Sequence, residues 1–79
     1  MNYNDLVRIF NHNGNLNVTS TVESIKDIVI YDVLGKTLLD KKNINKNEVT
    51  LNELRPITNV LVVKVTLENN KIILKKVIY

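Results

Sequence analysis

Residues 60–67 read Val-Leu-Val-Val-Lys-Val-Thr-Leu, and residues 72–79 read Ile-Ile-Leu-Lys-Lys-Val-Ile-Tyr. In the first segment the odd-numbered residues are all apolar, whereas the even-numbered ones include Lys64 and Thr66. Alternation with a period of two is typical of a β-strand that buries one face. Asn69 and Asn70 lie between the segments, and asparagine tolerates a positive φ better than any residue except glycine. These two segments therefore predict an antiparallel hairpin closed by a two-residue turn at Asn69-Asn70.

The rest of the chain repeats this pattern of short apolar runs separated by turn signals. Asn13-Gly14 suits the tight turn of a first hairpin, Gly35 is a natural left-handed residue, and Pro56 prevents a central strand from continuing. The pattern predicts seven strands, over residues 6–10, 15–20, 25–32, 36–42, 48–54, 60–67 and 72–79. No stretch keeps a helical period over three turns. The expected fold is therefore all-β, with two packed antiparallel sheets in a small sandwich.

The composition agrees with this class and narrows the chemistry. Among 79 residues there are 11 Val, 10 Leu and 9 Ile but no Ala, which disfavours helices. The absence of cysteine excludes disulfides and thiolate metal sites, and one histidine excludes a multi-histidine site. No apolar run is long enough for a transmembrane helix, and the polar residues 1–5 do not begin a secretory signal peptide.

Charges and reactive side chains do not predict catalysis or nucleic-acid binding. The net charge of +3 comes from dispersed Lys and Arg, and the four aromatic residues form no cluster. His12 lies in a turn beside no nucleophile, the two glycines are far apart, and no calcium-binding loop is present. A calcium site assembled from distant loops stays open. We therefore predict no enzyme activity, no cofactor, no nucleic-acid partner and no small-molecule substrate.

A specific pattern extends over most of the chain. Residues 28–36 read Ile-Val-Ile-Tyr-Asp-Val-Leu-Gly-Lys, residues 42–45 Lys-Asn-Ile-Asn, residues 49–54 Val-Thr-Leu-Asn-Glu-Leu, residues 59–65 Asn-Val-Leu-Val-Val-Lys-Val, and residues 75–79 Lys-Lys-Val-Ile-Tyr. In this order and spacing, residues 16–79 resemble the C-terminal sorting domain of type IX secretion system cargo proteins in Bacteroidetes. Two departures concern the subtype. Asn59-Val60-Leu61 stands where many members carry Gly-x-Tyr, and Lys36 stands where many carry Arg.

The resemblance implies a non-catalytic secretion signal with an immunoglobulin-like sandwich of about seven strands. The type IX translocon and outer-membrane shuttle or sortase proteins would read the folded domain and export the attached cargo through the periplasm to the cell surface or the medium. A surface sortase would then cleave the domain. On this interpretation residues 6–79 are the sorting domain, and residues 1–5 are the end of a linker or a cloning start. The chain would then be a fragment of a longer precursor whose signal peptide lies elsewhere.

We expect recognition at the turn, through Tyr31, Asp32, Gly35 and Lys36, and at the end, through Lys75, Lys76, Val77 and Ile78. The turn geometry by itself is a sufficient explanation for Gly35. A core does not require Lys75 or Lys76, so function is the better explanation for them.

Two alternatives to this interpretation remain. The domain could be a generic β-sandwich adhesion or carbohydrate-binding module, although such a module would carry more exposed aromatics. A small nucleic-acid-binding barrel is favoured only by the sequence pI of about 9.3. Unpaired strand edges would also allow a weak homodimer.

Overall fold

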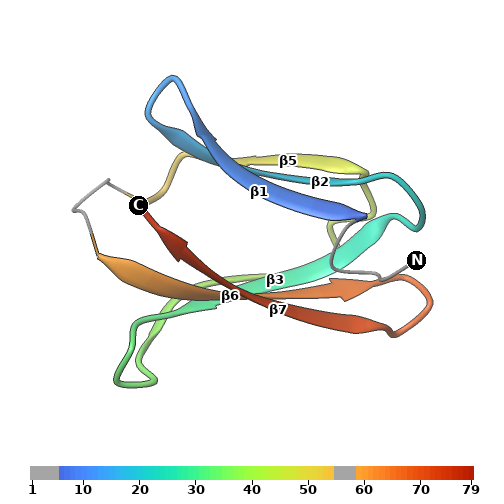
Figure 1. Ribbon diagram of the computed structural model, residues 1–79. Helices are drawn as coiled ribbons and strands as arrows, with labels where there is room; N and C mark the ends of the chain where they lie inside the picture. Colours follow the sequence, from blue (N-terminus) through green and yellow to red (C-terminus); the bar gives the residue numbers. More distant parts are fainter. Residues whose placement is uncertain (1–5, 55–58) are drawn as a thin grey trace.

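The computed structural model describes residues 6–54 and 59–79 (Figure 1). The linker or cloning start expected at residues 1–5 lies outside the described residues, and so does Pro56. The described part contains seven strands and no helix: β1 (Val7–His12), β2 (Asn15–Ser20), β3 (Ile25–Tyr31), β4 (Thr37–Lys41), β5 (Glu48–Leu51), β6 (Val60–Leu67) and β7 (Ile72–Ile78).

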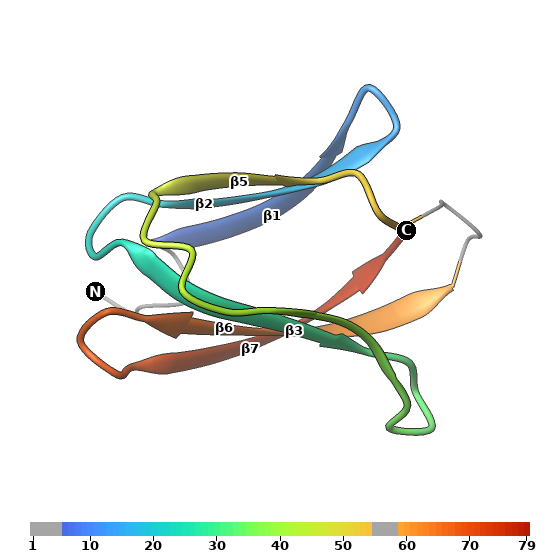
Figure 2. The same ribbon diagram turned by 180° about the vertical axis from the view of Figure 1, so that it is seen from behind.

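The strands form two antiparallel sheets that lie face to face, as both side views show (Figures 1 and 2). One sheet has the order β1-β2-β5, and the other has the order β4-β3-β6-β7. Both predicted hairpins, β1–β2 and β6–β7, are confirmed. The pairings β2–β5 and β3–β6 join strands that are distant in the sequence, as in immunoglobulin domains. In a constant-type immunoglobulin domain the fourth strand pairs with the fifth, whereas here β4 pairs with β3. The predicted immunoglobulin-like sandwich is confirmed.

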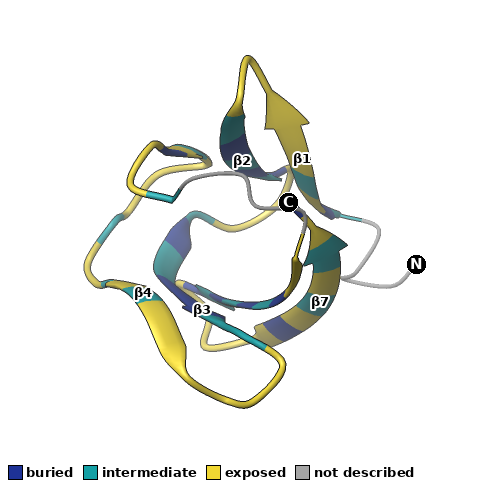
Figure 3. Cartoon of the chain, turned by 90° about the vertical axis from the view of Figure 1, so that its left-hand side faces the viewer, coloured by how far each residue is buried: buried dark blue, intermediate teal, exposed yellow. Residues whose placement is uncertain are grey.

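The core lies between the sheets and is supplied by alternate residues of each strand. In β6 the odd-numbered residues are buried and the even-numbered ones are half-buried or exposed, as the sequence pattern predicted. Figure 3 shows half-buried and buried residues alternating along β2, and exposed residues alternating with buried or half-buried ones along β7. The buried apolar cluster comprises Val7, Leu16, Val18, Ile25, Ile28, Ile30, Leu51, Leu61, Val63, Val65, Leu67, Ile73 and Tyr79. Burial of this apolar area is the main force that holds the sheets together.

Asparagine closes several of the turns. Apart from glycine, the described residues with a positive φ are all asparagine: Asn13, Asn43, Asn45 and Asn70. Asn13 and Gly14 form the predicted two-residue turn of the first hairpin, because His12 pairs with Asn15. A left-handed backbone therefore explains these four asparagines in a chain with only two glycines.

The predicted two-residue turn at Asn69-Asn70 is wrong. The backbone N–H of Asn70 donates to Leu67 O at 2.9 Å, and the N–H of Leu67 donates to Lys71 O at 2.9 Å. The loop therefore has three residues, Glu68 to Asn70, and only Asn70 has a positive φ (67°). This is a β-turn followed by a left-handed residue, which is a common three-residue hairpin loop.

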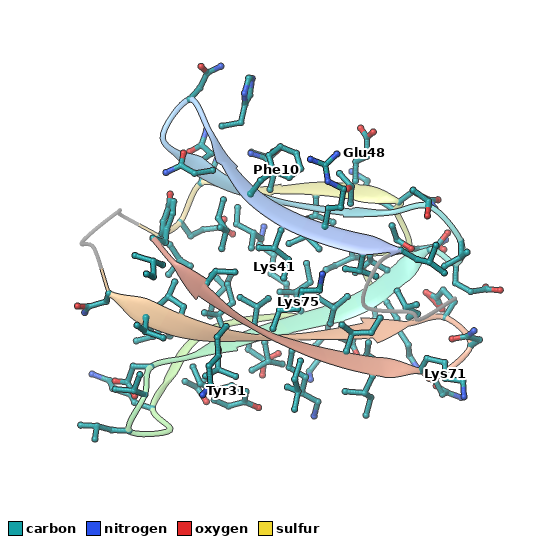
Figure 4. The ribbon with its side chains drawn as sticks, in the orientation of Figure 1. Phe10, Tyr31, Lys41, Glu48, Lys71 and Lys75 are labelled. Atoms are coloured by element: carbon teal, nitrogen blue, oxygen red, sulfur yellow. The ribbon has the colours of Figure 1, made fainter. Side chains whose placement is uncertain are left out.

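A lysine bridges the sheets at each open side of the sandwich (Figure 4). At one side, Lys41 Nζ of β4 lies 2.6 Å from Glu53 Oε2, just beyond β5. The hydrogen bond from the Lys41 ammonium lowers the pKa of the Glu53 carboxyl below its usual value of 4.5. At the other side, Lys75 Nζ of β7 donates to the carbonyl oxygen of Val7 in β1 at 2.6 Å. Polar contacts thus span the two sheets at both margins.

Candidate recognition surface

The turn after β3 is held by the side chain of Asp32. One carboxylate oxygen of Asp32 accepts hydrogen bonds from the backbone N–H groups of Leu34 and Lys36, both at 2.9 Å. The backbone adds bonds from Gly35 N to Asp32 O at 3.1 Å and from Asp32 N to Lys36 O at 2.9 Å. Gly35 has φ +87°, a conformation that side chains rarely adopt. Turn geometry therefore accounts for Asp32 and Gly35.

The tip of this turn is apolar and exposed. Val33 is 67% exposed and Leu34 is 90% exposed. A depression of about 420 Å³ lies between this tip and the start of β6, where Asn59 and Val60 line it. Because water-exposed leucine and valine gain nothing for the fold, the tip is the part of the turn that is free to contact another molecule.

The residues at the end of the chain point in two directions. Lys75 and Val77 lie on the inner side of β7 and are half-buried, and Val77 packs against the core. Lys76 and Ile78 are exposed on the outer side. Successive residues of a strand point to opposite faces, so the sequence alone places Lys75 on the face of Ile73 and Tyr79 and Lys76 on the other face.

Tyr79 has a structural role that the sequence pattern does not predict. Its side chain is 4% exposed, and its hydroxyl lies 2.5 Å from Gly14 O and 3.2 Å from Leu54 O. The backbone of Tyr79 exchanges two hydrogen bonds with Asn59. Tyr79 thus joins the last strand to the first hairpin and to the segment after β5. A tyrosine on a buried strand face is a signal for such a bond, because its hydroxyl then needs a partner.

Some of the predicted recognition residues do share a surface. We define the outer face as the side of the four-stranded sheet that points away from the three-stranded sheet. Tyr31 lies on it (Figure 4), and Val62 pairs with both Tyr31 and Lys76. Ile78 pairs with Val60 in the neighbouring row. The structure therefore brings Tyr31, Lys76 and Ile78 onto one face.

On β6 and β7 the outer face carries several exposed apolar side chains beside Lys64, Thr66 and Lys76. Its side chains from β6 and β7 include Val60 (40% exposed), Ile72 (56%), Leu74 (59%) and Ile78 (72%). The corresponding face of the three-stranded sheet is more polar. There Asn17 accepts a hydrogen bond from Thr50 at 2.8 Å, and the Arg8 guanidinium lies 5.4 Å from the centre of the Phe10 ring. The outer face of the larger sheet is the better candidate for contact with a partner.

The described residues hold no cluster of three or more His, Asp or Glu side chains that could bind a metal ion. Among the same residues, no helix is long and apolar enough to cross a membrane.

A family model described as a domain of unknown function, DUF8694, matches residues 1–79. The chain belongs to this family. The match spans the whole given sequence and so includes both sheets. No curated protein matches the chain.

Proposed function

We propose that this DUF8694 domain is a non-catalytic C-terminal secretion signal, which the type IX secretion machinery reads as a folded unit to export an attached cargo. The proposal is supported by the resemblance over residues 16–79 and by the immunoglobulin-like sandwich. The observation that carries it is the apolar outer face. It displays Lys76 and Ile78 from the resembling end of the chain beside Tyr31 from the resembling turn. In this proposal the domain passes through the periplasm, and a surface sortase then removes it.

The experiment is export of a periplasmic reporter fused before residue 1, in a bacterium with a type IX system. Deletion of residues 75–79 would be a poor test, because it removes the Lys75 and Tyr79 contacts that tie the sheets together. We therefore choose Lys76→Glu combined with Ile78→Thr, since both side chains are exposed. We expect at least a tenfold loss of export with an unchanged melting temperature.

A matched control changes the opposite side of the sandwich. Lys46→Glu lies on the connection between β4 and β5, and its export should equal that of the parent. If the parent domain itself does not direct export, the secretion proposal is refuted. Full export of the double variant, with export by the parent intact, would refute the assigned surface and leave the signal function standing.

A second candidate function is adhesion or carbohydrate binding, favoured by one observation. Phe10 is exposed on the outer side of the three-stranded sheet, next to Arg8 and opposite Asn17. An aromatic ring flanked by polar side chains suits a sugar ring, whose face is apolar and whose rim carries hydroxyls. A glycan array with the parent and Phe10→Ala distinguishes this function: signals that vanish in the variant would support it, and an empty array would refute it.

A further inference from the structure

We propose that the free edge of β7 pairs with an extended segment of a partner protein, and that this segment places apolar side chains on the outer face and a carboxylate opposite Lys76. This inference deepens the proposed function. It rests on the proposed function only for the identity of the partner, which would be a protein of the secretion machinery. Its test is a binding measurement on the isolated domain, so the two ideas can fail separately.

The hydrogen-bond pattern of the last hairpin shows which groups of β7 face the free edge. Asn59 and Tyr79 exchange both of their backbone bonds, and Leu67 N donates to Lys71 O. Bonded pairs recur at every second residue of an antiparallel ladder. The odd-numbered residues of β7 therefore bond to β6. The N–H and C=O groups of Ile72, Leu74, Lys76 and Ile78 point away from the sheet, of which β7 is the last strand within residues 6–54 and 59–79.

Of the four edge strands, β7 is the best suited to accept another strand. It has seven residues and pairs with β6 without a register shift. By contrast, β5 has four residues, and β4 has five with a register shift opposite the Ile30–Tyr31 step. In β1 the edge carbonyl of Val7 already accepts the Lys75 ammonium. A regular, long edge offers an added strand the most main-chain hydrogen bonds.

The side chains beside this edge set the chemistry of the added strand. Outward from β7 point Ile72, Leu74, Lys76 and Ile78, of which the three apolar ones are more than half exposed. Long apolar side chains on an exposed edge strand invite pairing, and natural proteins usually blunt such edges. An added strand would cover these side chains with its own same-face neighbours, as cross-strand pairs do within a sheet.

Charge decides between a second copy of this chain and a different partner. Residues 69–79 contain Lys71, Lys75 and Lys76 but no Asp or Glu. Pairing of β7 with β7 of another copy, in the register that sets the two Lys76 residues opposite each other, would bring two exposed ammonium groups together, and like charges across strands are destabilising. A strand with an acidic residue at the position opposite Lys76 replaces this repulsion by an attraction. Lys76 thus discourages self-pairing in this register and favours an acidic, apolar partner.

The test uses two capped synthetic peptides, Val-Thr-Glu-Thr-Val-Thr-Val and the same peptide with Lys in place of Glu. Aligned antiparallel to β7, the central residues place Glu opposite Lys76 and valines opposite Ile72, Leu74 and Ile78. We expect the Glu peptide to bind about fivefold more tightly than the Lys peptide in an NMR titration. Amide exchange should slow at Ile72, Leu74, Lys76 and Ile78, because their N–H groups become hydrogen-bonded.

Two variants make the result specific. Lys76→Glu should reverse the preference to the Lys peptide, whereas Lys46→Glu at the opposite margin should leave the preference unchanged. Equal affinity for the two peptides, absence of binding at millimolar concentration, or exchange protection at β1, β4 or β5 would overturn the proposal. A concentration-dependent dimer of the parent with protection at β7 would also overturn it, because the occupant would then be a second copy.

Discussion

Removal of the Tyr79 hydroxyl should destabilise the domain by breaking a bond between distant parts of the chain. In Tyr79→Phe the ring stays in place at its 4% exposure, but the hydroxyl near Gly14 O and Leu54 O is lost. The hydroxyl has one proton, so one hydrogen bond disappears and a carbonyl in a largely dry site loses its donor. Such a loss costs about 1–2 kcal/mol. For a domain of this size, 1 kcal/mol lowers the melting temperature by roughly 4–8 °C.

Thermal melts followed by circular dichroism measure this effect, with Tyr31→Phe as the matched control. Tyr31 is half-buried on the outer face, and among the described residues its hydroxyl has no hydrogen-bond partner. The control should therefore change the stability by less than about 0.5 kcal/mol. A Tyr79→Phe variant that melts within 1 °C of the parent would refute the reasoning that this hydroxyl ties β7 to the three-stranded sheet.

Three further outcomes follow from burial, backbone conformation and charge. Ile30→Ala should cost about 2–5 kcal/mol in urea unfolding because Ile30 is fully buried, and equal stability of Ile30→Ala and Leu34→Ala, at a 90% exposed position, would contradict this. Gly35→Ala should cost about 1–2 kcal/mol from its φ of +87° alone, since no atom lies near the added Cβ; an unchanged urea midpoint would show that the turn relaxes freely. The pKa of Glu53 is lowered in the folded state, so its stabilisation is present above pH 4.5 and is lost as the pH falls through the lowered value. Because both side chains are partly exposed, Glu53→Gln should cost only about 0.2–1 kcal/mol at neutral pH and nothing in strong acid, and a cost that persists in acid would exclude the Lys41 pair as its cause.

The fold could be predicted from the sequence because two local signals repeat along the whole chain. Alternation in residues 60–67 predicts the buried face of β6, and the structure confirms it residue by residue. In residues 72–79 both faces carry apolar side chains, so the pattern predicts a strand but not which face is buried. Asn13-Gly14 and Gly35 mark turns that the backbone requires, and both glycines have a positive φ. Strand alternation and turn residues are local signals, and at these positions the tertiary contacts of the fold agree with them.

The site was harder to predict because it depends on which residues meet across strands. The sequence prediction gives Lys75 and Lys76 the same role, although strand geometry directs Lys75 to Val7 O and Lys76 to the outer face. The contacts of Tyr79 join segments 65 and 25 residues apart in the sequence, and no local pattern specifies them. The predicted length of the β6–β7 loop is wrong because asparagine is compatible with both two-residue and three-residue hairpin loops.

The two bridging lysines make the sandwich sensitive to covalent chemistry at amines. Acetylation of Lys41 and Lys75 would neutralise both ammonium groups and leave each nitrogen one amide N–H, which weakens the contacts with Glu53 and Val7 O, whereas reductive methylation would keep the positive charge. The two reagents should therefore act differently on the same nitrogen atoms. An acylated molecule would loosen first along its two margins, where the strands meet solvent, while the aliphatic interior stays closed.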